Sequence, residues 1–191
     1  MPLTAGRGTA ILFWLAAFLG VITAAAAAPQ TITIAPGTTD IGFRLYLFGF
    51  LPLDGHFARF AGSLALDPAN PGRCHVAVRV ETESLVMPNA EALKIALGAD
   101  FLDAAHFPTL VYDGDCHPVS GAPPVLEGLL TMRGHSGPLV FTLHPSGDAF
   151  RVSADLHRAA WGMGAHPLLA RDTIRLRITT RLLAPAPQAA P

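Results

Sequence analysis

From about residue 30 onward, apolar and polar residues alternate along the chain. Between Asp172 and Leu183, isoleucine and leucine residues alternate with arginine and threonine. The segment His75–Thr82 repeats this pattern, with valines on one face and with Arg79 and Glu81 on the other. Because neighbouring side chains of a β-strand point to opposite faces, such alternation predicts strands that bury one face and expose the other.

Turn sequences rich in glycine and proline separate the alternating segments, and Arg133–Pro138 is typical of a hairpin turn. We expect strands near residues 31–35, 41–50, 56–67, 74–83, 109–118, 125–133, 138–144, 149–157 and 172–183. Eight or nine antiparallel strands predict an all-β fold, either a closed barrel or a sandwich. Closure into a barrel would remove the exposed sheet edges and could leave room for one ligand inside.

One helix is predicted between the strands, in the segment Asn89–Gly98. Asn89 can cap its first turn, and Glu91 lies where the helix dipole favours an acidic residue. Gly98 can end the helix in the left-handed conformation. The fold therefore contains one helical insertion.

Asp103 and His106 lie three residues apart, a spacing that raises the possibility of a catalytic pair. However, Asp100 can cap a short turn over residues 101–105, and Asp103 is then placed to bond back to the N–H of Asp100. We therefore interpret Asp103 as a residue that stabilises a backbone corner.

The sequences at both ends of the chain indicate segments that lie outside the folded domain. Arg7 precedes an apolar run and a stretch of alanines, the layout of a signal peptide over residues 1–28, so the protein is expected to be periplasmic or secreted. The alternative is an uncleaved segment that tethers the domain to a membrane. Residues 184–191 alternate proline with alanine and predict a flexible tail, which leaves one domain over residues 29–183.

Composition and charge narrow the range of partners. The chain has 13 lysine and arginine residues against 14 acidic residues, and Lys94 is its single lysine. Because the arginines are scattered, we predict no nucleic-acid partner. The hydrophobic share of 51% suits either a filled core or a cavity for an apolar ligand. We leave open a homodimer and a transient contact with a membrane surface.

The sequence carries no local signature of a catalytic or metal site. It contains no H-E-x-x-H motif, no nucleophile elbow and no glycine-rich phosphate loop, and its histidines are spread through turns and strand ends. We therefore predict no catalytic residues, no metal and no enzymatic activity. A hydrolase is the weakest alternative.

Cys74 and Cys116 are predicted to form a disulfide. If residues 74–83 and 109–118 form neighbouring antiparallel strands, pairing Thr82 near Thr109 places Cys74 opposite residue 116 or 117. Both cysteines then share the inward phase of their strands. In an exported protein such a pair favours a disulfide, which would contribute about 4 kcal/mol to stability.

A zinc site is the competing interpretation, because a histidine follows each cysteine. Strand alternation would, however, point His75 and His117 to the face opposite the sulfurs, whereas structural zinc needs four converging ligands. Two unpaired thiols remain a third interpretation if the two strands are not neighbours.

Four segments occur in an order and at a spacing that resemble a known family. They are "DGHFARFAGSLALDPANP" (residues 54–71), "FLDAAHFPTLVYDG" (101–114), "GLLTMRGHSGPLVF" (128–141), and "HRAAWGMG" (157–164) followed by "RDTIRLRI" (171–178). On these segments the chain resembles the YceI-like family over most of its length.

The resemblance implies an antiparallel closed barrel of about eight strands that is lipocalin-like and carries one helical insertion. It also implies that the interior binds a polyisoprenoid chain or an isoprenoid quinone, and that the protein is a binder or carrier without catalytic residues. An apolar chain gains about 0.8 kcal/mol for each buried methylene, so a long prenyl tail needs no polar groups for tight binding.

Strand phase identifies the side chains expected to line the interior. These are Phe43, Leu45, Leu47, Phe60, Leu64, Val76, Val78, Val80, Leu110, Tyr112, Leu130, Met132, Phe141, Leu143, Trp161, Met163, Leu176 and Ile178. A plainly packed barrel core would use the same residue types in the same phase.

The chain departs from the family pattern at positions where a polar headgroup could be held. As the resemblance aligns them, Thr38 and Thr39 replace a His-Ser pair, and Leu47 replaces a histidine of the second strand. These departures keep open a second function, that of an exported accessory or interaction protein with a filled barrel and no ligand.

Overall fold

Eleven strands account for most of the residues that the computed structural model describes, which are 30–66, 70, 72–146 and 149–181. The strands are β1 (Gln30–Ile34), β2 (Thr39–Leu47), β3 (Leu51–Phe57), β4 (Phe60–Leu66), β5 (Cys74–Glu81), β6 (Leu85–Val86), β7 (Thr109–His117), β8 (Val125–Met132), β9 (His135–Ser146), β10 (Ala149–His157) and β11 (Thr173–Arg181). The helix α1 (Ala90–Leu97) and the 3-10 turns η1 (Thr82–Ser84) and η2 (Arg158–Trp161) complete the described elements.

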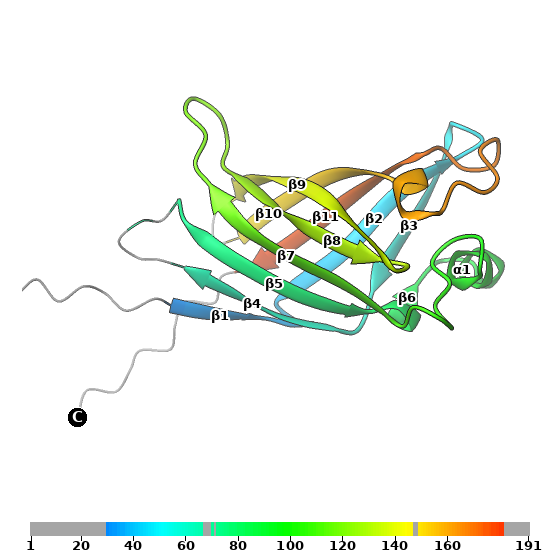
Figure 1. Ribbon diagram of the computed structural model, residues 1–191, viewed down its shortest axis with the longest axis horizontal. Helices are drawn as coiled ribbons and strands as arrows, with labels where there is room; N and C mark the ends of the chain where they lie inside the picture. The colour runs from blue at the N-terminus through cyan, green and yellow to red at the C-terminus, as the bar shows by residue number, and fades with distance from the viewer. Residues whose placement is uncertain (1–29, 67–69, 71, 147–148, 182–191) are drawn as a thin grey trace, which may run out of the picture.

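All eleven strands belong to one antiparallel sheet, in the order β1-β4-β5-β7-β8-β9-β10-β11-β2-β3-β6. The sheet curls around an apolar interior as a half-barrel, and α1 lies at one end of it (Figure 1). The predicted all-β antiparallel fold with one helical insertion is therefore confirmed.

The prediction of a closed barrel of about eight strands is wrong. Within the described residues no ladder joins β1 to β6, the two ends of the strand order. The seam therefore lies between β1 and the edge formed by β3 and β6, because β3 pairs with β2 and β6 whereas β4 pairs with β1 and β5. The connection from β3 to β4 bonds to η1 and to the end of β5: Ala58 N donates to the Ser84 carbonyl, and Glu81 N donates to the Arg59 carbonyl.

The sequence predicted nine strands and the described residues form eleven, because some turns carry no clear turn sequence. Residues 56–67 contain the end of β3 and all of β4, separated by Ala58 and Arg59, and this pair carries neither glycine nor proline. Between β2 and β3 the chain reverses at Phe48 and Gly49, which have φ angles of 50° and 84°. Alternation alone does not locate the β2–β3 turn, since the inward phase of Leu45 continues at Phe57 beyond it.

The β8–β9 hairpin is tighter than Arg133–Pro138 suggested. Only Arg133 and Gly134 lie outside the strands, and both have positive φ angles, 52° and 71°. Two such residues match the right-handed twist of the strands that they join. His135 and Ser136 consequently belong to β9, and the hydroxyl of Ser136 lies 2.7 Å from that of Thr131 on β8.

The N-terminus of α1 forms as predicted, whereas its C-terminus does not. The Asn89 carboxamide oxygen accepts hydrogen bonds from Glu91 N (2.8 Å) and Ala92 N (3.3 Å). Gly98 is extended, with φ −72° and ψ 172°, so the predicted left-handed end is wrong. The Gly98 carbonyl instead accepts from the N–H groups of Phe101 and Asp103, which folds the chain into the next corner.

Asp103 stabilises this corner by a contact other than the predicted one. Its carboxylate lies 2.8 Å from Nδ1 of His106 and does not receive the N–H of Asp100. Asp103 itself has a φ of 48°, in the left-handed region that aspartate and asparagine tolerate better than most residues. The two side chains meet because residues 104–106 form a turn.

We expect Asp103→Ala to lower the free energy of unfolding by about 1 kcal/mol, because alanine is strained at a left-handed position and the contact with His106 is lost. Asp103→Asn, which tolerates that conformation, should cost less, and His106→Ala should cost little because its side chain is 76% exposed. Chemical denaturation of the three variants measures this order. A His106→Ala variant less stable than Asp103→Ala would contradict it.

The predicted signal peptide (1–28) and proline-rich tail (184–191) lie outside the described residues. Among the residues that the structure describes, no helix is long and apolar enough to span a membrane.

Candidate ligand-binding site

The inward-facing side chains of the curled sheet enclose a cavity of about 460 Å³. It arises because side chains alternate along each strand, so every strand from β1 to β11 except β6 contributes side chains to the interior, most of them apolar. These side chains do not fill the space that the curvature encloses. The volume lies within the range of pockets that hold small molecules, roughly 300–1,000 Å³.

The cavity extends along the whole length of the strands. Gln30, Leu66 and Pro124 line it near one end of the half-barrel. At the other end, Phe101, from the corner after α1, and Met163, from the loop after η2, are lining residues. A long, narrow apolar ligand would fit this shape better than a compact polar one.

Three of the polar side chains in the lining, those of Thr39, Tyr112 and Thr180, bond to other parts of the protein. The Tyr112 hydroxyl donates to the carbonyls of Leu126 (3.2 Å) and Leu139 (3.1 Å), and burial raises the pKa of its phenol. The hydroxyls of Thr39 and Thr180 lie 2.7 Å apart and bond to each other. Such groups offer little to a charged or strongly polar ligand, because a polar group that enters the cavity loses its hydrogen bonds to water.

Two glycines make room for the Tyr112 ring. Gly114 on β7 and Gly128 on β8 face each other in the register of the sheet. A Cβ atom on Gly128 would lie 2.8 Å from Cζ of Tyr112 and 2.3 Å from the Asp113 carbonyl oxygen. The ring also packs edge-on against Phe141, with 5.2 Å between centroids. The position of Tyr112 in the cavity wall therefore depends on both glycines.

Most of the side chains that strand phase selected lie in the cavity wall. Those that line it are Phe43, Leu45, Leu64, Val76, Val78, Val80, Leu110, Tyr112, Leu130, Met132, Phe141, Leu143, Met163, Leu176 and Ile178. Leu47, Phe60 and Trp161 are not among the lining residues.

These three side chains lie elsewhere for different reasons. Phe60 and Trp161 are buried in the packed core. The Trp161 indole N–H donates to the Leu130 carbonyl at 3.3 Å, and its ring lies against Gly137, so it packs on the β8–β9 hairpin. Leu47 ends β2 and pairs with Ala170 in an isolated bridge, at the rim of the half-barrel.

Sequence reasoning also missed several lining residues. On β10, whose extent was predicted correctly, Phe150, Val152 and Leu156 follow the inward phase and could have been named. Ala96 and Phe101 come from the helical insertion and the corner after it. Strand phase carries no information about these two, because their direction depends on how the insertion packs against the sheet.

The predicted disulfide between Cys74 and Cys116 is confirmed. The two strands are neighbours, with His75 opposite Asp115 in the register, and the Cα atoms of the cysteines are 4.8 Å apart. The bond engages both sulfurs, which rules out the zinc interpretation and the unpaired thiols. His75 lies on the exposed face, where its Nδ1 is 2.9 Å from an oxygen of Asp115.

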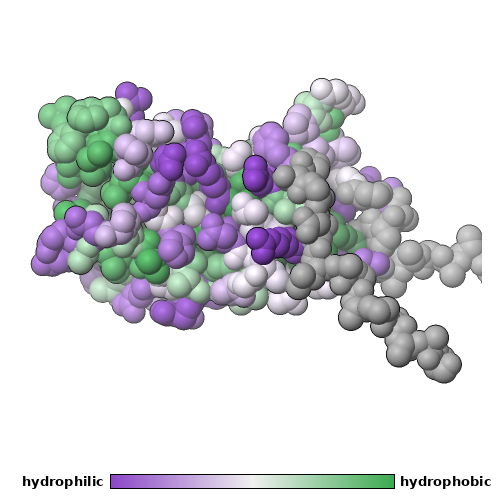
Figure 2. All heavy atoms as spheres, turned by 180° about the vertical axis from the view of Figure 1, so that it is seen from behind, coloured by the Kyte–Doolittle hydropathy of each residue, from purple (hydrophilic) through white to green (hydrophobic). Residues whose placement is uncertain are grey.

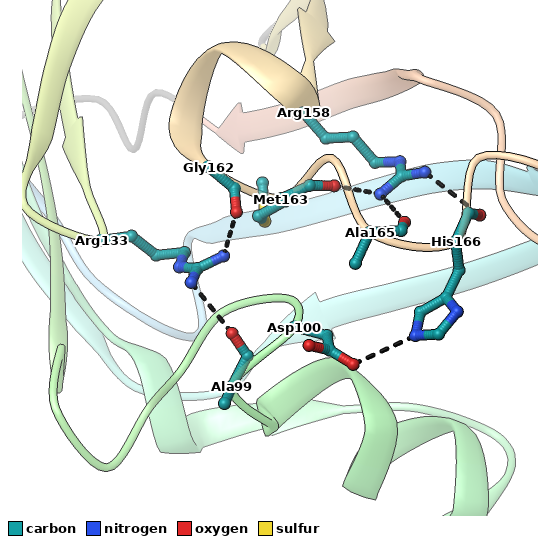
Figure 3. A network of polar contacts seen from close by, with 8 residues as sticks. All are labelled: Ala99, Asp100, Arg133, Arg158, Gly162, Met163, Ala165 and His166. Atoms are coloured by element: carbon teal, nitrogen blue, oxygen red, sulfur yellow. Dashed lines mark hydrogen bonds and ion pairs between the residues drawn. The ribbon is translucent and has the colours of Figure 1, made fainter.

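A network of polar contacts joins the loops at the α1 end of the cavity (Figure 3). Arg133, from the β8–β9 turn, donates to the carbonyls of Gly162 (2.5 Å) and Ala99 (2.9 Å). His166 Nε2 lies 3.0 Å from a carboxylate oxygen of Asp100. These contacts tie the corner after α1 to the loop after η2, so the cavity is bounded there by two connected segments.

Arg158 organises the loop after η2 from inside. Its side chain is 2% exposed and donates to the carbonyls of Met163, Ala165 (2.8 Å), His166 (3.4 Å), Ala170 (2.9 Å) and Arg171 (3.1 Å). Burial lowers the pKa of its guanidinium. Within the part of the chain that the structure describes, all side-chain hydrogen bonds of Arg158 go to backbone oxygens, so this one side chain holds the loop together.

The sequence matches the YceI-like domain family over residues 32–182, which is nearly all of the described chain. The chain belongs to the YceI-like family. A UPF0312 protein of Vibrio cholerae is 32% identical to this YceI-like chain over 135 residues, covering 70% of this chain and 71% of the relative. Protein YceI of Salmonella arizonae is 30% identical over 127 residues, covering 66% of each chain.

Solved structures share the fold of this YceI-like protein. BcnA of Burkholderia cenocepacia superposes with a TM-score of 0.64 at 16% identity, over 76% of this chain and 96% of that one. A polyisoprenoid binding domain from Saccharophagus degradans superposes with a TM-score of 0.50 at 11% identity, over 80% of this chain and 98% of that domain. At such identities the likeness concerns the fold.

The acid and histidine pair that first suggested catalysis lies away from the cavity of this YceI-like protein. Asp103 and His106 are both absent from the lining, and His106 is largely exposed. Among the residues that the structure describes, no group of three or more histidine, cysteine or acidic side chains is arranged to hold a metal ion.

Proposed function

We propose that this protein binds and carries an apolar isoprenoid-type lipid, a polyprenol or an isoprenoid quinone, in the cavity of the half-barrel. The observation that carries the proposal is the cavity itself, which is mainly apolar and runs the length of the strands, and in which the hydroxyls of Thr39, Tyr112 and Thr180 are bonded within the protein. The lining residues on the sheet would contact the chain of the ligand. No side chain has to act as an acid, a base or a nucleophile.

Energetics support a chain-like ligand. Burying each methylene contributes about 0.8 kcal/mol, so several isoprene units would offset the loss of translational freedom on binding. The structural likeness to a domain described as polyisoprenoid-binding points in the same direction. The alternative of a filled barrel without a ligand is disfavoured, because close packing of the interior would leave voids hardly larger than a water molecule.

The disulfide supports export as part of this function. Disulfides persist in oxidising compartments such as the periplasm, where an apolar lipid that leaves a membrane needs protection from water. We propose that the protein acts there, either free after removal of residues 1–28 or tethered through them.

The test begins with native mass spectrometry and organic extraction of the protein purified from its own periplasm. We expect a co-purifying prenyl lipid, or uptake of added polyprenol or quinone from detergent by the delipidated protein. A ligand-free spectrum together with no uptake of either lipid would overturn the proposal.

Cavity-filling variants locate the bound lipid. Val78 on β5 and Leu176 on β11 lie on separate walls of the cavity. We expect Val78→Trp and Leu176→Trp to weaken lipid binding by about tenfold or more, because a bulky ring occupies the space of the chain. Val140→Trp, on the half-exposed outer face of β9, is the matched control and should bind normally. Equal affinity in all three variants would place the lipid outside the cavity.

A further inference from the structure

Four exposed apolar side chains gather at one end of the molecule. Phe48 (60% exposed), Phe50 (77%) and the half-exposed Leu51 lie in and beside the β2–β3 turn, and Leu168 (90%) lies in the loop after η2. We call these four residues the apolar tip. Figure 2 shows hydrophobic residues gathered at this end of the molecule, and Figure 1 shows the two loops projecting there side by side.

Backbone contacts hold the two loops of the apolar tip together. Phe48 N donates to the Leu169 carbonyl at 2.9 Å, and Arg171 N donates to the Tyr46 carbonyl at 3.0 Å. An isolated bridge also pairs Leu47 with Ala170. The buried Arg158 fixes the second loop from inside through its five carbonyl contacts. The loops are therefore built to present these side chains to the outside.

A cation stands beside the apolar tip. Arg171 is exposed, and its guanidinium lies next to Gly49: a Cβ atom on that glycine would be 3.3 Å from the Nε atom. Within the described part of the chain, the Arg171 side chain takes part in no ion pair. A free guanidinium next to projecting aromatic rings suits a surface that combines anionic headgroups with acyl chains.

We infer that the apolar tip is a membrane-docking surface, which inserts Phe48, Phe50 and Leu168 into a lipid bilayer and sets Arg171 against anionic headgroups. Two projecting turns enter the headgroup region readily, whereas a protein partner of this surface would need a matching cavity. Binding at such a surface grows with the buried apolar area and with attraction to anionic lipid.

The position of the tip connects it to the cavity. The loop that carries Leu168 also supplies Met163 to the cavity wall, and its His166 stacks on Phe101, another lining residue, with 6.4 Å between ring centroids. This inference rests on the proposed function, because an apolar lipid resides in a bilayer before the protein takes it up. Docking through the tip would bring the α1 end of the cavity close to that source.

Vesicle flotation of the protein in its exported form tests the inference. The probes are vesicles of phosphatidylcholine and vesicles of an equimolar mixture of phosphatidylcholine and phosphatidylglycerol. We expect binding that is stronger with the anionic mixture. Phe48→Ser combined with Phe50→Ser should weaken vesicle binding by about tenfold or more, since two rings no longer leave water.

Two further variants make the test specific. Leu129→Thr combined with Val140→Thr removes two other exposed apolar side chains (56% and 48%) from the outer face of β8 and β9, and should leave vesicle binding unchanged. Arg171→Gln should abolish the preference for anionic vesicles and retain binding to the neutral ones. No vesicle binding by the wild type, or equal losses in the tip and the β8–β9 variants, would overturn the inference.

Lipid uptake from detergent separates this inference from the proposed function. A protein that takes up polyprenol from detergent but binds no vesicles would retain the proposed function and lose the docking surface. One that binds vesicles through the tip but takes up no polyprenol or quinone would retain the docking surface and lose the proposed function. The tip variant should load lipid from detergent as the wild type does.

Discussion

Replacing both Cys74 and Cys116 with serine is expected to lower the free energy of unfolding by about 4 kcal/mol. The two residues are separated by 42 positions, and opening a loop of that length restores a large conformational entropy to the unfolded chain. Because a domain of this size has a total stability of only about 5–15 kcal/mol, the loss is a large fraction of it. Guanidinium denaturation followed by circular dichroism measures the change.

The wild type under reducing conditions is the matched control for the serine variant. Once reduced, it should unfold at nearly the same denaturant concentration as the variant, whereas adding reductant to the variant should change nothing. A variant as stable as the oxidised wild type would contradict the prediction and show that the bond restricts the unfolded chain far less than its loop length implies.

Replacing Arg158 with methionine is the second change expected to have a large effect. The substitution removes the guanidinium from five carbonyls, in a region where Arg158 is almost inaccessible to water. The His166 carbonyl keeps the N–H groups of Leu169 and Ala170 as donors, so the loss falls on the other four. Each buried carbonyl without a partner costs about 1–3 kcal/mol, less wherever water can reach it. We therefore expect a loss of about 4 kcal/mol or more in the free energy of unfolding.

Hydrogen exchange separates this effect from general destabilisation. Relative to the wild type, Arg158→Met should exchange the amides of residues 163–171 faster, whereas the amides of β7 and β8 should change less. The reason is that the loop loses its hydrogen bonds to the guanidinium while the sheet keeps its own. Arg151→Met, on the exposed face of β10, is the control and should stay within about 0.5 kcal/mol of the wild type. Unchanged protection of the loop in Arg158→Met would contradict the role assigned to this arginine.

The disulfide and Arg158 lie at opposite ends of the cavity, so the two substitutions should affect different parts of the proposed lipid site. The disulfide joins β5 to β7 at the end lined by Gln30 and Pro124, and both cysteines belong to the cavity wall. Arg158 holds the loop that supplies Met163 at the other end. Lipid uptake by the two variants should therefore report on the two ends of the cavity separately, provided that both remain folded.

Several features of this protein followed from the sequence because they depend on local geometry. The alternation of apolar and polar residues located most strands and their inward faces, since successive side chains of a strand must point in opposite directions. The same rule placed Cys74 opposite Cys116 once their strands were taken as neighbours. Asn89 was identifiable as a helix cap because its side chain bonds within its own turn.

Other features were decided only by the tertiary structure, because they depend on contacts between segments far apart in the sequence. The seam between β1 and the β3–β6 edge follows from which strands pair, and the turn at Ala58 and Arg59 contains neither glycine nor proline to mark it. The cavity exists because the curvature of the whole sheet encloses more space than its side chains fill. Likewise, only the tertiary structure shows that the buried Arg158 bonds to the carbonyls of one loop. It alone also shows that Phe48 and Leu168, on two loops that bond to each other, belong to one surface.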